Sequence, residues 1–304
     1  MKYLNYLMVG TFALALSACG GDSGSSAPPA PTYSGITTPV AITSTNAPVL
    51  STKATDATEE AITQQTASDS NPFGISATTA NSDINPLITR ITREVVNQTQ
   101  ANINLPAGAT ITLTDPPFCG GSISYPDNMG SGGTLNGTIT YNNLCYDDGG
   151  LYGQITINGT VTFTETVSTI TIRYINFRIT GTGLSETVNM TVSCDTSFFS
   201  CSISADFTGS DGKVYRIADM SVSGSGTGPY YINATFYHPD YGSVILSSTG
   251  LYYACSNGYP SAGTISITGS GTSSASITFN SDCTGYTGTW DDGISTGTFS
   301  GTWL

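Results

Sequence analysis

The sequence predicts a mainly β fold: a disulfide-stapled antiparallel β-sandwich or open barrel-like meander, with one short N-terminal helix. Three observations predict it. From about residue 110 onward, apolar and polar residues alternate in stretch after stretch, as they do when one face of an antiparallel sheet is buried and the other is wet. Only 10% of the 304 residues are charged, while the chain has 35 glycines and many Ser and Thr residues. Its seven cysteines suit a disulfide framework.

The N-terminus is typical of an export signal. Lys2 precedes an apolar run over residues 4–16, which is shorter than the roughly 20 residues of a transmembrane helix. Leu16-Ser17-Ala18-Cys19 then resembles the lipobox of bacterial lipoproteins, in which the signal is cut just before a cysteine that receives lipid. The alternative is an ordinary secretory signal with an incidental cysteine.

The lipobox resemblance implies that residues 1–18 are a signal peptide and that acyl chains attach at Cys19. More than one acyl chain gives stable membrane attachment. By resemblance to enterobacterial lipoprotein sorting, in which an Asp at this place favours retention at the inner membrane, Gly20 implies sorting to the outer membrane. The protein would then face the periplasm or the cell surface.

Residues 19–82 are low in complexity, rich in Gly, Ser, Pro, Thr and Ala. They contain few large apolar residues, so burial could not offset the entropy cost of ordering them. We therefore expect a disordered tether, followed by one folded domain over residues 83–304.

One helix is expected at the start of that domain, over about residues 85–102. Asn85 can cap it and Pro86 can occupy its first position. Helical spacing then places several apolar residues on one face. These are Leu87, Ile88, Ile91, Val95 and Val96.

Strands follow with a period of two, most clearly at residues 155–164. Asp211-Gly212 and Asp292-Gly293 are favourable hairpin turns. The spacing of the alternating segments favours a meander of antiparallel strands. The other predicted strands span residues 170–180, 186–194, 201–208, 213–223, 230–238, 243–249, 263–268, 274–280 and 297–303.

Six cysteines remain when Cys19 is set aside, and an even number in an exported chain predicts three disulfides. We favour sequential pairing among the 15 possible arrangements. The favoured pairs are Cys119 with Cys145, Cys194 with Cys201, and Cys255 with Cys283. A metal site is a weaker explanation, because the sequence has no C-x-x-C and a single histidine.

An internal similarity supports this pairing. Residues 133–145 align with 271–283, with Gly, Thr, Ile, Thr, Asn and Cys in matching places and Tyr141 opposite Phe279. Each segment has another cysteine upstream and Asp-Asp-Gly downstream. A duplicated disulfide-clipped unit explains this, and chance similarity between Thr/Gly-rich strands is the alternative.

The aromatic segment at residues 230–238 is the most suggestive binding surface. Alternation predicts Tyr231, Asn233 and Tyr237 on one polar face. Tyrosine rings on such a face can stack on sugars or anchor a protein, or they can simply form cross-strand pairs that stabilise the sheet. The candidate binding residues are Tyr231, Asn233, Tyr237, His238 and Tyr241. The turn at residues 237–242 resembles those of uncharacterised proteobacterial lipoproteins. This resemblance implies no particular activity.

Other chemistry is less well supported. His238 would have to serve any Ser-His-Asp triad, yet it lies in a turn and the sequence contains no G-x-S-x-G. Glu165 and Glu186 could form a glycosidase pair but are better explained as solvated carboxylates. Weak calcium candidates lie in Asp-Gly turns without the spacing of an EF-hand, and the turns alone are enough to explain them. These candidates are Asp147, Asp148, Asp291 and Asp292.

The net charge of −13 and the lack of a basic patch argue against nucleic acid as a partner. We predict a non-enzymatic, membrane-anchored lipoprotein that binds an envelope protein or a glycan and needs no cofactor. A self-assembling structural component of the envelope is the main alternative, and a secreted hydrolase is a lesser one.

Overall fold

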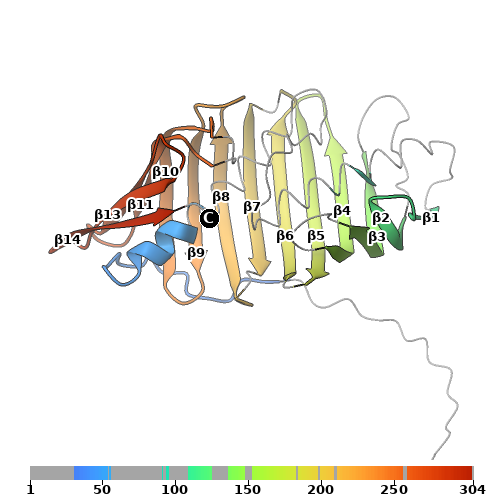
Figure 1. Cartoon of the computed structure of the whole chain (residues 1–304), viewed down its shortest axis with the longest axis horizontal. Helices are drawn as coiled ribbons and strands as arrows, with labels where there is room; N and C mark the ends of the chain where they lie inside the picture. Colours follow the sequence, from blue (N-terminus) through green and yellow to red (C-terminus); the bar gives the residue numbers. More distant parts are fainter. Residues whose placement is uncertain are drawn as a thin grey trace, which may run out of the picture.

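A computed structural model describes residues 31–53, 55, 91, 94–95, 109–124, 136–147, 153–182, 184–197, 199–208, 211–255 and 259–302. It contains a 14-stranded antiparallel sheet in which each strand pairs with its neighbours in the sequence (Figure 1). The predicted mainly β, disulfide-stapled meander is therefore confirmed. Of the two forms left open, the open meander is the correct one, because all the strands in the described residues belong to one sheet and its end strands do not pair with each other.

The predicted strands correspond to β4–β12 and β14, and the sheet also contains β1, β2, β3 and β13. The bounds are β1 (Thr110–Thr112), β2 (Phe118–Ser124), β3 (Asn136–Asp147), β4 (Gln154–Glu165), β5 (Thr169–Gly181), β6 (Leu184–Asp195), β7 (Ser200–Thr208), β8 (Val214–Ser223), β9 (Tyr231–His238), β10 (Gly242–Tyr252), β11 (Ala262–Thr268), β12 (Ser274–Phe279), β13 (Gly285–Asp291) and β14 (Thr296–Thr302).

The two faces of the sheet differ as the alternation predicts. In β4, Ile157, Val161 and Phe163 are buried, while the threonines between them are not. We call the face that carries the buried side chains the inner face and the opposite one the outer face. Tyr141 and Phe177 pack edge to face on the inner side, with ring centroids 5.2 Å apart.

A row of β-bulges crosses β3, β4 and β5. Asn143, Gly159 and Asn176 have positive φ angles of 47°, 121° and 49°, and the strand registers shift beside them. Side-chain amide oxygens accept hydrogen bonds from the backbone N–H groups at the bulges. Asn143 N–H donates to Asn158 Oδ1 at 2.9 Å, and Asn176 N–H donates to Asn189 Oδ1 at 2.7 Å. Bulges of this kind bend and twist the strands that carry them.

Residues 31–46, which we call the strap, run along the strand ends and pack against the sheet (Figure 1). Tyr33 N–H donates to Asp206 Oδ2 at 3.0 Å, and Val40 N–H donates to Ser243 O at 3.0 Å. A short helix follows at residues 47–53, and its Ala47 and Leu50 join the core of the inner face.

The tether predicted for residues 19–82 is therefore wrong for residues 31–53. The composition of the whole segment is poor in apolar residues, but Tyr33, Ile42 and Leu50 are buried to relative exposures of 6%, 0% and 1%. Backbone hydrogen bonds between the strap and the sheet also help to order this segment. Residues 1–30, with the signal peptide and Cys19, lie outside the described residues.

The helix predicted at 85–102 lies mostly outside the described residues too. Three of its residues, Ile91, Glu94 and Val95, are described, and all three are helical. Ile91 and Val95 are fully buried in the core, which agrees with the predicted apolar face. In the described part of the chain, no helix has the length and apolar character needed to cross a membrane.

The three favoured disulfides are present: Cys119–Cys145, Cys194–Cys201 and Cys255–Cys283. The first joins β2 to β3, and the second joins directly paired residues of β6 and β7. The third joins the segment after β10 to the turn after β12. The internal similarity does not extend to the aspartates, because Asp147 ends β3 whereas Asp291 ends the strand beyond the second repeat.

Candidate functional site

The outer face of β9 carries part of the predicted binding surface. Tyr231 is half exposed and Asn233 is exposed, while Ile232 and Phe236 between and beyond them are buried. The predicted alternation is therefore correct. Tyr237 lies on the same outer face, but the ring of Tyr33 from the strap packs 5.7 Å from its own ring.

His238 and Tyr241 belong to a different environment. His238 is only 4% exposed, its ring is 5.2 Å from that of Tyr215 and 4.5 Å from that of Tyr241. Its Nδ1 accepts a hydrogen bond of 3.2 Å from Asp240 N–H. The five predicted residues thus do not form one site: Tyr231 and Asn233 are open to solvent, whereas His238 is a packed residue at the end of β9.

His238 should make stability depend on pH. Burial lowers the pKa of its imidazole, an effect that outweighs the opposing charge of Asp240. The unfolded chain therefore takes up a proton near pH 6.5 that the folded protein resists. Unfolding becomes easier as the pH falls below about 6.5 and on toward the lowered folded pKa. We expect the melting temperature to be lower at pH 5.5 than at pH 7.5.

A His238→Gln variant separates the effect of the imidazole from any effect of carboxylates. It keeps Asp240 and Lys213 and removes only the imidazole. Its melting temperature should change less over the same pH interval. An equal change in the variant and the original protein would show that other groups cause the effect.

The outer face carries a continuous row of Ser, Thr and Asn side chains, which we call the hydroxyl rank. Each member is the direct register partner of the next, from β3 to β14. All are at least partly exposed, and none is charged. The hydroxyl rank is Asn136, Thr164, Thr171, Ser193, Ser202, Ser221, Asn233, Ser247, Ser266, Ser276, Thr289 and Thr298.

Neighbouring members of the rank hydrogen-bond to one another in places. The hydroxyl oxygens of Thr171 and Ser193 are 3.1 Å apart, and those of Ser276 and Thr289 are 2.8 Å apart. Strands in a sheet lie about 4.8 Å apart, so the rank presents polar groups at that regular interval. Side-chain ladders of this kind also stabilise a sheet and limit its twist.

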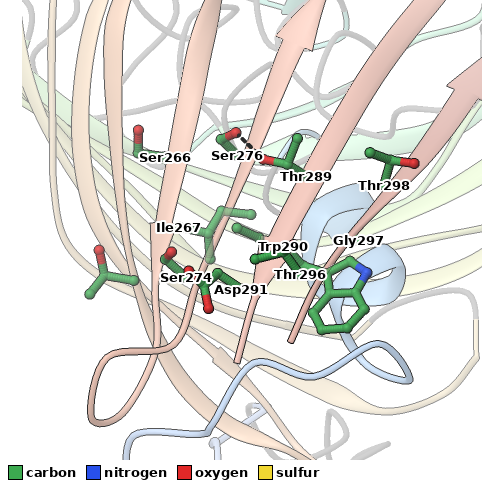
Figure 2. Close-up of a pocket in the computed structure, with 12 residues that line it drawn as sticks. Ser266, Ile267, Ser274, Ser276, Thr289, Trp290, Asp291, Thr296, Gly297 and Thr298 are labelled. Atoms are coloured by element: carbon green, nitrogen blue, oxygen red, sulfur yellow. Dashed lines mark hydrogen bonds between the residues drawn. The ribbon is translucent and has the colours of Figure 1, made fainter. Parts of the chain in front are cut away.

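Further rows run beside the rank over β11–β14, two residues along each strand. One row consists of Thr264, Thr278, Thr287 and Ser300, and another of Thr268, Ser274, Asp291 and Thr296. A shallow hollow of about 490 Å³ lies here. Figure 2 shows Ser266, Ser276, Thr289 and Thr298 in line across it, with the Ser276–Thr289 hydrogen bond dashed.

Trp290 marks one end of the hollow and packs against a glycine of the next strand. A Cβ atom on Gly297 would lie 2.6 Å from the indole Nε1, so only glycine leaves room for the ring. Phe299 covers Gly288 in the same way, since a Cβ there would lie 2.1 Å from the ring. Aromatic rings over cross-strand glycines shield the exposed backbone and pin the strand register.

Charged groups gather instead beside the strap. Arg216 Nε and Nη2 donate to Asp206 at 2.7 and 2.8 Å, and the guanidinium lies 5.3 Å from the Tyr33 ring centroid. Burial would raise the pKa of Asp206, but hydrogen bonds from Arg216 and from Tyr33 N–H lower it overall. Lys213 pairs with Asp240 nearby. Asp206 also accepts a hydrogen bond from Tyr33 N–H, so the Arg216–Asp206 pair helps to hold the strap on the sheet.

The calcium candidates hold turns in the structure. Asp291 Oδ1 accepts a 2.7 Å hydrogen bond from Gly293 N–H, and Asp292 Oδ1 accepts one of 2.7 Å from Ser295 N–H. Asp147 is exposed at the end of β3, and Asp148 lies outside the described residues. Within the ranges that the structure describes, no three His, Cys, Asp or Glu side chains are grouped as a metal site would require.

Glu165 and Glu186 do not form a catalytic pair. They flank opposite ends of β5, where Glu165 pairs with Ile170 and Glu186 with Ile179. That spacing along a strand corresponds to about 30 Å. Retaining and inverting glycosidases need their carboxyl groups within about 10 Å.

Comparisons with protein-family models, with curated proteins and with solved structures give no match to this chain. The site must therefore be interpreted from its own geometry. Sequence reasoning found Tyr231 and Asn233 but missed the hydroxyl rank around them, because the rank depends on the register of every strand. Its signal is the Ser or Thr at every second position of the predicted strands.

Proposed function

We propose that this protein is a lipid-anchored envelope lipoprotein whose outer sheet face binds a neutral polysaccharide. The observation that carries the proposal is the hydroxyl rank with the rows beside it. They form a regular lattice of hydrogen-bond donors and acceptors, in which Asp291 is the one charged member and all the others are neutral. A polymer with regularly repeated hydroxyl groups can meet such a lattice at many points, and many weak contacts held on one scaffold give useful affinity.

The charge of the chain narrows the choice of polymer. A net charge of −13 repels polyanions such as acidic capsules or nucleic acids. The cationic side chains of the described outer face near the strap are already paired with Asp206 and Asp240. We therefore expect a neutral polymer, bound by hydrogen bonds that are insensitive to salt.

The proposed location rests on the lipobox-like Leu16–Cys19 and is supported by the cysteines. Three disulfides in one chain fit an oxidising compartment outside the cytoplasm. A lipid at Cys19 would hold the domain at the outer membrane, within reach of periplasmic or surface glycans.

The test removes hydroxyls from the rank and keeps the shape of the sheet. In the triple variant Ser266→Ala, Ser276→Ala and Thr289→Val, each lost hydrogen bond to the polymer should cost about 1 kcal/mol. Affinity for a neutral polysaccharide should then fall about 100-fold. Binding is measured by affinity electrophoresis and by co-sedimentation with a panel of soluble and insoluble neutral and acidic glycans.

Thr289→Ser is the matched control, because it keeps the hydroxyl and should bind almost as well as the original protein. Equal binding by the triple variant would exclude the rank as the binding surface. If no neutral polysaccharide of the panel binds, and an envelope protein is captured instead, the glycan proposal is wrong and a protein partner replaces it.

A further inference from the structure

We infer that β14 pairs edge to edge with β14 of a second copy of this chain, so that two sheets join into one. The inference goes beyond glycan binding and does not depend on it. It starts from the open ends of the meander. β14 pairs with β13 and lies at the end of the sheet farthest from β1 (Figure 1).

The edge at β14 lacks the features that usually prevent such pairing. Natural edge strands are shortened, bulged, or carry charges or proline. β14 is seven residues long, matches β13 without a register shift, and reads TGTFSGT with neither charge nor proline. At the other end, β1 has three residues and offers a much shorter edge.

The hairpin shows which backbone groups β14 turns outward. Asp292 N–H donates to Ser295 O at 3.1 Å, just beyond the last register pair of β13 and β14. Hydrogen-bonded and non-hydrogen-bonded pairs alternate in an antiparallel ladder. Gly297, Phe299 and Gly301 therefore bond to β13. The backbone groups of the residues between them point to the free edge: Thr296, Thr298, Ser300 and Thr302.

One register uses all of these outward groups. A twofold axis at Phe299, the middle residue of β14, pairs Thr298 with Ser300 of the second copy and Thr296 with its Thr302. The two Phe299 residues then form a non-hydrogen-bonded pair, in which the Cα atoms of directly opposite residues are closest. Self-complementary pairing about a twofold axis closes the assembly at two copies, whereas pairing of β14 with β1 would give an open filament.

The pairing would also extend the polar outer face. Thr298 is the last member of the hydroxyl rank, and it would meet Ser300 of the second copy, which belongs to the neighbouring row. The neutrality of β14 matters here, because each copy carries a charge of −13 and a charged edge would repel its twin.

The first test measures mass. The full chain, purified in detergent, should show a dimer by sedimentation velocity at concentrations of tens of micromolar. Thr298→Pro removes one outward N–H and leaves the bonds to β13, so it should weaken dimerisation at least 10-fold. Thr298→Val keeps that N–H and should still dimerise, which makes it the matched control. A monomeric original protein, or equal dimerisation of the proline variant, would overturn the inference.

The second test is independent of how well the proline variant folds. Phe299→Cys places a thiol at the twofold axis, whereas Thr296→Cys places it about 20 Å from its own twofold mate. Mild oxidation should crosslink the Phe299→Cys protein at least 10 times faster than the Thr296→Cys protein. Equal rates, or faster crosslinking at Thr296, would contradict the proposed register.

Discussion

Replacing Gly159 by valine should be the most damaging single change considered for this sheet. Gly159 has φ +121°, a conformation that side-chain-bearing residues rarely adopt, and a Cβ there would lie 2.5 Å from Asn176 O. Backbone strain and overpacking each cost about 1–3 kcal/mol, so we expect a loss of unfolding free energy on the order of 4 kcal/mol. Urea denaturation followed by circular dichroism measures it.

Gly271 provides the control for that prediction. It has φ +64°, but no heavy atom lies within 4 Å of the position that its Cβ would take. Gly271→Val should therefore cost only the backbone strain, about 1–2 kcal/mol. If the two variants lose similar free energy, the close approach of β4 to the bulge of β5 is not what requires glycine.

Removing the Cys255–Cys283 disulfide should cost about 3–4 kcal/mol, since its 28-residue separation closes a long loop in the unfolded chain. Removing Cys194–Cys201, with a separation of 7, should cost about 2–3 kcal/mol. Paired Cys→Ser variants, compared by urea denaturation under non-reducing conditions, measure both losses.

The order of the two losses is the informative result. A greater loss at Cys194–Cys201 would mean that the short link between β6 and β7 acts through native packing rather than through the unfolded chain. Reduction of the original protein provides a control, because it should lower stability by more than either paired variant.

The alternation at residues 155–164 was enough to predict β4, because one buried face leaves a period of two in the sequence itself. The bulges at Asn143 and Asn176 left no comparable signal. Their stability depends on amide oxygens of Asn158 and Asn189, which the folded register brings opposite them. Local patterns therefore predicted the strands, whereas their bends depend on contacts between strands.

The strap shows the same limit at longer range. Tyr33 lies in a segment whose composition predicts disorder, yet its hydroxyl donates to Ile36 O at 2.6 Å and to His238 O at 3.1 Å. His238 lies 205 residues from Tyr33, so no local sequence pattern around Tyr33 can reveal this contact. For the same reason, the sequence predicted only part of the binding face. Tyr231 and Asn233 follow from alternation within β9, but the hydroxyl rank depends on the register of every strand.

The strap also has a mechanical consequence for an anchored protein. The chain from Cys19 to Pro31 spans about 40 Å at most when fully extended, so a lipid at Cys19 would keep Pro31 close to the membrane. A pull between the membrane and a bound polymer would enter the domain at Pro31, whose carbonyl accepts a bond from Asn189 of β6. The hydrogen bonds of Tyr33 would then transmit the force to β7 and β9, and the hydrogen bond of Val40 would transmit it to β10. The tension would be shared among four strands, so no single hairpin has to bear it alone.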